Sequence, residues 1–416
     1  MRAEYNIAVV GAGVAGLSAA SLLASHGHRI TLFDQFHEPQ PIGSGLIVQP
    51  VGQRVLDQLG LLSSAKSIGV PIKGLIGHSH PSNRIALDAD YKAGGSDTRG
   101  LALHRGALFD LLYAEAVAQG VQIETGQFAL DAVVSSDPYI RFEGGGQAGP
   151  FDLVVDAAGA GSPLSPLTTS PLSFGALWST IGLPTGEGDL NGILRQRYLG
   201  AHRMAGVLPI GYLPNDPVPM AAVFWSMTRD EHKVWLDRDF QEWKDEATQL
   251  WPDFGVVISD LYDHSDMVFA TYAHGSLNKP YRNRVVHIGD AAHQASPQLG
   301  QGANMALIDA MVLSESIAAT SSVPAALRRY TMRRLAHVKT YQALSRVVTP
   351  LYQSRYSAAG WARDNLVTPL TRIGPMRNLV RRVITGEIVP SGLASDARRS
   401  PPVRAVPSAP SREPGE

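Results

Sequence analysis

The chain has 416 residues, 44% of them hydrophobic, and a formal net charge of −1. This size allows a large core and more than one domain, and the charge gives no reason to expect a nucleic-acid partner. Cysteine is absent, which excludes disulfides, cysteine-bound zinc, iron–sulfur clusters and a cysteinyl–cofactor bond; no metal site is expected. No run approaches the ~20 apolar residues of a membrane span or forms a signal peptide, so a cytoplasmic protein is expected.

The chain opens with a strand, a glycine-rich turn and a helix. Residues 6–10 are apolar, and residues 17–24 continue as a helix with small side chains. A second strand, residues 29–33, ends at Asp34, about where the ribose-binding acid of a dinucleotide fold lies. A tight turn without a ligand is the simpler reading of the glycines alone. With the flanking elements, the pattern favours a dinucleotide site made by Gly11, Ala12, Gly13, Val14, Ala15, Gly16 and Asp34.

The middle of the chain changes to strands with strong alternation. They are expected at 194–199, 204–210, 220–228 and 267–273, with a hairpin at 72–87 from the same layer. Asp239 is expected to cap a helix, with Glu242 returning the bond and Leu236 on its apolar face. If that helix covers the outer side of the sheet, the inner side lines a ligand pocket. Candidate lining residues are Tyr198, Leu208, Ile210 and Phe224; core packing is an equally open reading, because a one-residue shift reverses the faces.

Residues 284–309 combine a buried strand, an acidic turn and a helix opened by glycine. Asp290 follows the strand at its carboxyl end, where α/β sheets bind ligands, and a carboxylate there accepts hydrogen bonds from ribityl hydroxyls. The amino end of the next helix favours an anion such as a reduced flavin. The expected contacts are Gly289, Asp290, Pro297, Gly300, Gly302, Ala303 and Asn304. His293 lies beside the turn. An acid–base role for it is the less favoured of two interpretations.

The carboxyl-terminal third is expected to be helical. A long helix at 325–348 is expected to end at Pro350, with a buried stripe of Leu327, Tyr330, Leu335, Val338, Tyr341 and Val348. A second helix begins at Pro375, and its apolar face opposes three arginines. That pattern is also typical of a membrane-surface helix, but docking on the protein itself is the favoured reading, so membrane contact is not expected. Residues 389–416 are expected to be disordered.

Together these motifs resemble the group A FAD-dependent monooxygenases, the family of para-hydroxybenzoate hydroxylase and related aromatic hydroxylases. The resemblance covers about residues 1–385 and includes Leu103-His104-Arg105 and the segment 45–50. It implies that Arg105 contacts FAD and that residues 45–50 lie beside the isoalloxazine ring. The expected fold is α/β, in which a Rossmann-type FAD-binding domain (1–72, 100–165 and 283–325) is interleaved with a substrate domain. That second domain, with a mixed or antiparallel sheet, comprises 73–99 and 166–282, and helices follow at 326–388.

The resemblance also implies an activity. FAD is held without a covalent bond, NAD(P)H reduces it, and O2 adds at the flavin C4a carbon. The resulting hydroperoxide hydroxylates an electron-rich aromatic small molecule. Dehydrogenation, reduction or halogenation on the same fold stays open, although the Trp-x-Trp-x-x-Ile segment usual in related halogenases is absent. A non-catalytic flavin-binding protein is the remaining alternative.

One position departs from the family pattern. An Asp-Gly pair is expected after the strand at 152–155, but Ala158 precedes Gly159. In the family that aspartate is associated with FAD and NAD(P)H, so the departure bears on the use of NAD(P)H. Asp156, two residues earlier and on the same side of an extended strand, is a candidate substitute.

Overall fold

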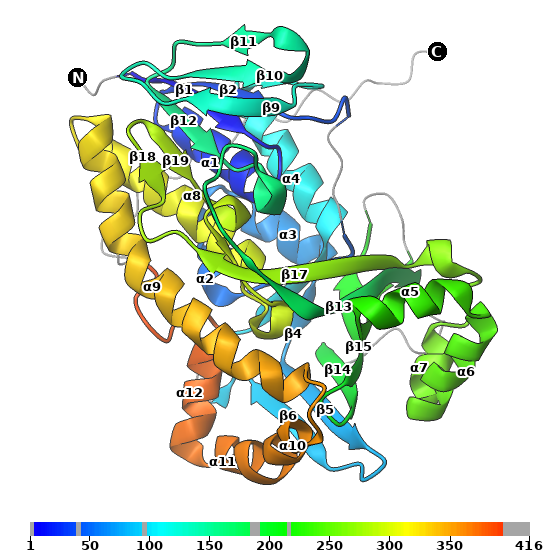
Figure 1. The fold of residues 1–416 in the computed structure, drawn as a ribbon. Coiled ribbons are helices and arrows are strands. Elements are labelled where there is room, and N and C mark those ends of the chain that lie inside the picture. The colour runs from blue at the N-terminus through cyan, green and yellow to red at the C-terminus, as the bar shows by residue number, and fades with distance from the viewer. Residues whose placement is uncertain (1–3, 39–42, 94–97, 184–191, 214–217, 394–416) are drawn as a thin grey trace, which may run out of the picture.

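Two large sheets organise the computed structural model, which describes residues 4–38, 43–93, 98–183, 192–213 and 218–393 (Figure 1). One sheet has six strands and the other has eight, and two three-stranded sheets accompany them. Helices of the carboxyl-terminal region lie along one side and across the lower end of Figure 1. The predicted α/β class, with a Rossmann-type sheet, a mixed sheet and carboxyl-terminal helices, is confirmed.

The six-stranded sheet is buried on both faces. Its order is β18-β19-β12-β1-β2-β8, and β1 pairs in parallel with both β12 and β2. Helices α1 (Val14–Ser25), α4 (Arg105–Ala118) and α8 (Gly302–Ala318) pack on one face, and β9 to β11 cover the other. This burial explains why the central strands β1, β12 and β19 read as largely apolar runs. The strands of this layer are β1 Asn6–Val10, β2 Arg29–Phe33, β8 Gln122–Glu124, β9 Ala129–Val133, β10 Tyr139–Phe142, β11 Gln147–Ala148, β12 Leu153–Asp156, β18 Tyr281–Arg282 and β19 Val285–His287.

The eight-stranded sheet has the order β20-β17-β13-β16-β15-β14-β5-β6. Its pairs are antiparallel except for β14 with β5, which makes the sheet mixed. The predicted hairpin and four strands are all present. The long β13 was not predicted, because Pro171 and Gly175 interrupt its apolar pattern. The strands are β5 Gly74–His80, β6 Ile85–Asp90, β13 Ser170–Gly182, β14 Ile193–Leu199, β15 Arg203–Gly211, β16 Met220–Thr228, β17 Val268–Ser276 and β20 His293–Gln294.

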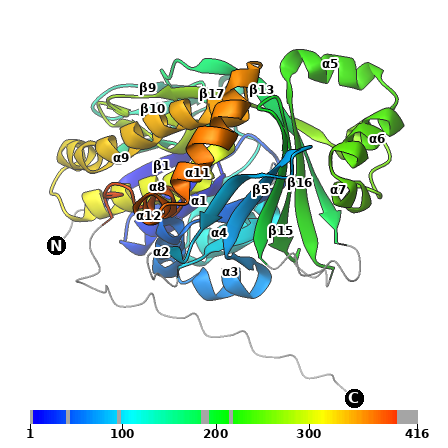
Figure 2. The same cartoon turned by 90° about the horizontal axis from the view of Figure 1, so that it is seen from below.

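Three short helices cover the outer face of this sheet, as Figure 2 shows from below: α5 (Arg229–Asp237), α6 (Phe240–Leu250) and α7 (Pro252–Val257). Asp239 caps α6 as predicted, accepting from the Gln241 amide at 2.9 Å. The prediction that Glu242 returns this bond is wrong. The capping box forms instead one helix earlier, at α5, between Thr228 and Glu231. Leu236 was also misplaced. It belongs to α5 and is exposed.

A small sheet joins the two large layers. It has the order β3-β7-β4, with β3 Gly45–Val48, β4 Val70–Ile72 and β7 Gly100–His104, and α2 (Pro50–Gln58) and α3 (Leu62–Ile68) follow β3. A Cβ added at Gly45 would lie 2.4 Å from Ile210 Cγ2 and 2.8 Å from Ala222 Cβ. Glycine therefore lets β3 lie directly against the eight-stranded sheet.

The carboxyl-terminal helices differ from the prediction in detail. Helix α9 (Val323–Tyr352) runs past Pro350, which lies in its last turn. Leu335, predicted to be buried, is 38% exposed, and Arg334 and His337 take its place inside. The chain continues through α10 (Ser357–Ala362), a π-helical turn (Arg363–Val367), α11 (Thr368–Thr371) and α12 (Gly374–Ile384).

Helix α12 docks on the protein itself, as favoured from the sequence, since Val380 and Ile384 belong to the core beneath it. Disorder from residue 389 is wrong for 389–393, because the Ser391 carbonyl accepts a 2.6 Å hydrogen bond from Arg334. Residues 394–416 lie outside the described residues. Among the described helices, none has the length and apolar character needed to cross a bilayer.

Candidate cofactor and active site

The three glycines of the first turn have three different structural roles. Gly11 has φ +101°, and a Cβ there would lie 2.6 Å from the Ala157 carbonyl oxygen. A Cβ at Gly16 would lie 1.8 Å from the Gly11 oxygen, so this glycine permits close packing. A Cβ at Gly13 would meet nothing within 4 Å. The turn therefore leaves its open side at the amino end of α1, where a pyrophosphate is bound in dinucleotide folds.

Asp34 holds this turn in place. It lies at the end of β2 and is 8% exposed. Its Oδ2 accepts from the Ala12 amide at 2.7 Å, and its Oδ1 accepts from the Phe36 amide at 2.9 Å. Each oxygen retains a further lone pair. A direct bond to ribose stays a prediction, to which the structure adds a role in shaping the glycine turn.

The Gly289-Asp290 turn is pressed between two helices. Gly289 has φ +59°, and a Cβ there would lie 3.1 Å from Ala15 Cβ and 3.5 Å from Ala306 Cβ. The turn thus lies between the dinucleotide helix α1 and α8. Asp290 is accessible to solvent. Desolvation by the protein around it raises the pKa of its carboxyl, and the charges of His293 and Arg105 oppose the shift.

Arg105 and Asp290 are close enough for the charge of each to act on the pKa of the other. The resemblance implies that both contact FAD, and those contacts stay predictions. Arg105 follows β7, whose partner strand β3 pairs Gly45 with His104, and its amide donates to the Ser44 carbonyl at 2.8 Å. Desolvation lowers the pKa of Arg105, and the charge of Asp290 opposes that shift. The structure therefore brings together the segment before β3, the start of α4 and the acidic turn, which are far apart in the sequence.

The Asn304 side chain has a structural role that was not predicted. Its Oδ1 accepts from the Gln49 amide at 2.7 Å, and its Nδ2 donates to the carbonyls of Ile47 and Gly300, both at 3.0 Å. Because its polar atoms bind the backbone, this side chain fastens the segment after β3 to α8. Cofactor contacts of Asn304 and Gly302 stay predictions. Gly302 is exposed at the start of α8, and a Cβ there would meet nothing within 4 Å.

A buried charged network beneath the acidic turn was not predicted. Asp309 is fully buried, and its Oδ2 accepts from the Gly289 amide at 2.9 Å and lies 2.6 Å from His293 Nε2. Its Oδ1 accepts from Arg334 Nε at 2.7 Å. Burial opposes ionisation, but the charges of His293 and Arg334 hold the pKa of Asp309 well below its usual range. The sequence signal was the position of Asp309 among the apolar residues of α8.

His293 is therefore part of the support of the flavin turn. It is 7% exposed, and its Nε2 is used by Asp309. This arrangement favours a positioning role over proton transfer to a substrate. A catalytic role for His293 stays an untested prediction.

Asp156 is not placed to substitute for the missing family aspartate. It is fully buried and lies 2.7 Å from His287 Nδ1, and it accepts from the Ser162 hydroxyl at 2.7 Å. The argument that it shares a side with Ala158 is wrong, because the strand ends at Asp156 and Ala158 has φ −74° and ψ 11°. Its carboxylate faces the interior, whereas Ala158 is partly exposed.

The four candidate lining residues lie on the inner face of the eight-stranded sheet, opposite α5 to α7. Tyr198 is fully buried under the Arg363 guanidinium, 4.4 Å from its ring, so it packs against the carboxyl-terminal helices. Ile210 lies against Gly45. Leu208 and Phe224 belong to the same inner cluster, and Phe224 lies 4.8 Å from the Trp178 ring. Contact with a substrate stays a prediction for all four.

Two partly exposed aromatic residues on this face were missed. Trp178 Nε1 donates to the Tyr272 hydroxyl oxygen at 2.8 Å. Desolvation raises the pKa of Tyr272 to about 12, and Arg105 is close enough to oppose the shift. Ser44, which precedes β3, lies 2.7 Å from the Thr180 hydroxyl. The inner face of the sheet and the flavin segments therefore meet at polar and aromatic side chains.

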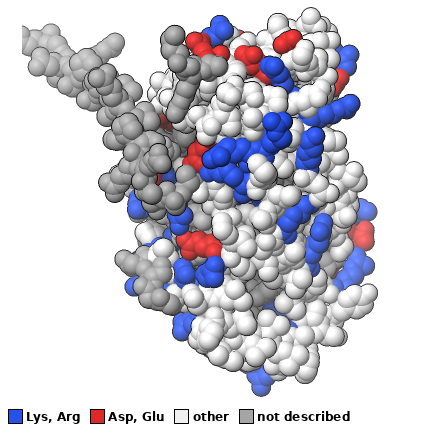
Figure 3. Space-filling model, turned by 90° about the vertical axis from the view of Figure 1, so that its left-hand side faces the viewer, with Lys and Arg blue, Asp and Glu red and all other residues white. Residues whose placement is uncertain are grey.

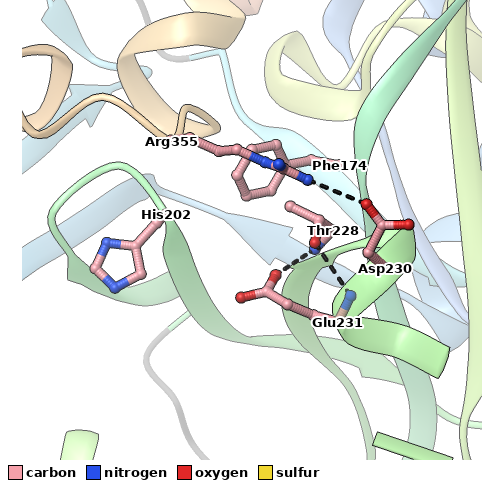
Figure 4. Close-up of a pocket in the computed structure, with 6 residues that line it drawn as sticks. All are labelled: Phe174, His202, Thr228, Asp230, Glu231 and Arg355. Atoms are coloured by element: carbon pink, nitrogen blue, oxygen red, sulfur yellow. Dashed lines mark hydrogen bonds and ion pairs between the residues drawn. The ribbon is translucent and has the colours of Figure 1, made fainter. Parts of the chain in front are cut away.

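A cavity of about 380 Å³ lies elsewhere, where β13, α5 and the segment after α9 meet (Figure 4). Arg355 and Asp230 are 3.4 Å apart at its edge, and Thr228 and Glu231 form the capping box of α5. None of the flavin motifs contributes to it, so it is not the cofactor site. The lining residues are Phe174, His202, Thr228, Asp230, Glu231 and Arg355.

The FAD binding domain family matches residues 4–163 and 194–345. The chain belongs to this family. A 3-amino-4-hydroxybenzoate 2-monooxygenase of Streptomyces cremeus is 30% identical, over 80% of this chain and 84% of the relative. A probable 2-heptyl-3-hydroxy-4(1H)-quinolone synthase of Rhodococcus erythropolis is 26% identical, over 91% of this chain and 94% of the relative. In fold, the flavoprotein is similar to Klebsiella pneumoniae HpxO complexed with FAD and uric acid. The TM-score is 0.75 at 18% identity, over 92% of this chain and 97% of HpxO.

The family match, the similar proteins and the geometry of the site indicate the same activity. The protein is an FAD-dependent monooxygenase of the group A aromatic hydroxylase class, as its sequence indicated. The residues fit the cofactor: open glycines lie at the starts of α1 and α8, and Asp290 and Arg105 are close enough for their charges to act on each other. With FAD as cofactor, NAD(P)H is the reductant typical of these monooxygenases.

Proposed function

We propose that this flavoenzyme uses NAD(P)H and O2 to hydroxylate an electron-rich aromatic small molecule bound between FAD and the inner face of the eight-stranded sheet. The observation that carries the proposal is the hydrogen-bonded pair Trp178 and Tyr272 on that face, close to Arg105. The names of the two curated relatives describe reactions on rings that bear hydroxyl or amino groups or a ring nitrogen, which supports this substrate class.

FAD supplies the redox chemistry when it is bound, because it accepts reducing equivalents from NAD(P)H and activates O2. The protein's contribution is to bind, orient and shield. Trp178 and Phe224 present aromatic surface against which a planar ring packs. The open amino end of α8 at Gly302 stabilises negative charge on the bound flavin.

Tyr272 is the proposed anchor for a substrate hydroxyl. Its oxygen accepts from Trp178, so its own proton is directed to another acceptor. Since its pKa is raised to about 12, Tyr272 is protonated at neutral pH and donates to a phenolic or phenolate oxygen. Trp178 fixes the direction of that bond.

A substrate panel tests this proposal. Hydroxy- and aminobenzoates and hydroxyquinolones are screened for stimulation of NAD(P)H oxidation, and the best substrate is then used with Tyr272→Phe. Loss of one hydrogen bond should lower kcat/KM by about two- to tenfold. An analogue without the hydroxyl should show no such loss. Tyr262→Phe, at a 77% exposed tyrosine, is the control. Equal kcat/KM in wild type and Tyr272→Phe for every substrate would contradict the assignment.

A further inference from the structure

The carboxyl-terminal helices carry a row of large apolar side chains that face solvent. Trp361, Leu366, Leu370 and Ile373 are 60%, 52%, 55% and 56% exposed. They come from α10, the π-helical turn, α11 and the residue before α12. These helices lie together at the lower end of the molecule in Figure 1 and face the viewer in Figure 2. We call these four residues the apolar ridge.

The π-helical turn places three of the four side chains on one face. Trp361 and Leu366 are five residues apart, the spacing that a π-helical turn aligns. Leu370 follows Leu366 at a spacing of four, which shares a face in ordinary helix. Without the extra residue of the π turn, Trp361 would be rotated away from Leu366 and Leu370. Ile373 lies beyond the end of α11, at the bend before α12. Met376 and Leu379, each 39% exposed, extend the apolar surface onto α12.

The opposite side of the same helices is already docked. Arg363 is fully buried, with its guanidinium 4.4 Å from the Tyr198 ring and 5.4 Å from the Tyr352 ring. The Thr368 hydroxyl donates to the Ala86 carbonyl at 2.8 Å. The helices are thus anchored by one face, and the ridge points away from the core. Large exposed apolar surfaces of this kind mark contacts with other molecules or membranes.

The surface around the ridge is rich in arginine. Residues 365–384 contain four arginines and neither aspartate nor glutamate. Arg377 lies 3.2 Å from Asp90, and Arg372 lies 3.8 Å from Asp88, so part of this charge is balanced. Among the described residues around the ridge, cations still outnumber acids. The cations are Arg54, Arg84, Arg372, Arg377, Arg381 and Arg382, and the acids are Asp88, Asp90, Asp364 and Glu387. Figure 3 shows Lys and Arg outnumbering Asp and Glu on the side of α9 and α12, above a largely uncharged lower end.

Contrary to the expectation from the sequence, we propose that the apolar ridge docks on an anionic lipid surface. Its apolar side chains enter the boundary between headgroups and acyl chains, and the neighbouring arginines contact anionic headgroups. A tryptophan beside leucine and isoleucine, flanked by arginine, is the composition that such a boundary favours. A second copy of the chain fits less well, because a two-fold contact would place the same arginines opposite their own copies.

Vesicle flotation tests the proposal with the full-length, FAD-loaded protein. The probes are phosphatidylcholine vesicles and vesicles that also contain phosphatidylglycerol. Wild type should float with the anionic vesicles, and added salt should weaken the binding. Trp361→Ser with Leu370→Ser should lower partitioning by at least about tenfold. The control, Val234→Ser with Val256→Ser, removes two equally exposed apolar residues from α5 and α7 and should bind like wild type.

Several results would overturn the proposal. Wild type could fail to bind either kind of vesicle. The double variant Trp361→Ser with Leu370→Ser, called the ridge variant, could bind like the control, or size exclusion could show a wild-type dimer that the ridge variant dissociates. In the last case the ridge is a self-interface. FAD content and thermal melting check the fold of each variant. If the ridge variant unfolds, vesicles that contain brominated lipid provide the test. They should quench the tryptophan fluorescence of wild type more than that of Trp361→Phe. Equal quenching would also contradict the proposal.

Discussion

Asp309, in the middle of α8, accepts a hydrogen bond from the amide of Gly289 at 2.9 Å. This bond joins the acidic flavin turn to the helix whose amino end faces the same site. The other carboxylate oxygen binds Arg334 of α9, and Arg334 donates in turn to the Ser391 carbonyl at 2.6 Å. The position of the flavin turn therefore depends on an ion pair in the interior and on the segment after α12.

Asp309→Asn should destabilise the protein and weaken FAD binding. It leaves the Arg334 guanidinium buried without its counter-charge, which costs about 3 to 5 kcal/mol. Chemical unfolding of the apoprotein measures the loss, and fluorescence quenching measures FAD affinity. Glu315→Gln, on the same helix, removes the partner of the partly exposed Arg333 and should cost about 1 kcal/mol or less. Similar losses of stability and FAD affinity in the two variants would show that the Asp309 network contributes no more than a partly exposed ion pair.

Asp290 should bind FAD directly. Asp290→Ala deletes a charged acceptor worth about 1.5 to 3 kcal/mol, so FAD affinity should fall by about one to two decades. Asp290→Asn should lose less, because it keeps an acceptor oxygen. Titration of the three apoproteins with FAD checks the order. Unchanged affinity in Asp290→Ala would show that the side chain does not touch the cofactor.

His337 should make the fold sensitive to acid. Burial and the charge of Arg334 lower its pKa to about 3, from 6.5 in an unfolded chain. Since the unfolded chain takes up this proton first, stability is complete above about pH 6.5 and falls as the pH drops from there towards 3. This residue should make the protein about 2 kcal/mol less stable at pH 5 than at pH 7. Urea unfolding across this range should give a flatter profile for His337→Gln, and an equally steep profile would be evidence against this assignment.

The two glycine turns of the candidate site could be predicted from sequence because their residues are local. Gly11, Gly13 and Gly289 come at or just after the end of a buried strand. The hydrogen bonds of Asn304 and Asp309 were missed, because their partners are distant in the sequence or are backbone groups. Trp178 was missed because strand β13 was not predicted. Pro171 and Gly175 interrupt its alternation of apolar and polar residues. The ridge depends on a π turn, which no sequence period indicates.

Ala158→Asp should speed flavin reduction by NAD(P)H. Restoring one polar contact of the family pattern changes a rate by about two- to a hundredfold. Anaerobic stopped-flow at saturating substrate measures the reduction rate, and FAD affinity should change little. Asp156→Ala should instead lower stability, because it leaves the buried His287 without its partner. If Asp156→Ala selectively slowed reduction in a protein of normal stability, Asp156 would be the nicotinamide residue after all.

The measurement that tests the account most directly is the fate of isotopically labelled O2. Purified, FAD-loaded protein is given NAD(P)H, an aromatic substrate from the panel and labelled O2, and the product is analysed by mass spectrometry. The account predicts one labelled oxygen atom in each hydroxylated product, with NAD(P)H oxidation that depends on substrate. A product formed without labelled oxygen, by dehydrogenation, reduction or halide addition, would contradict it.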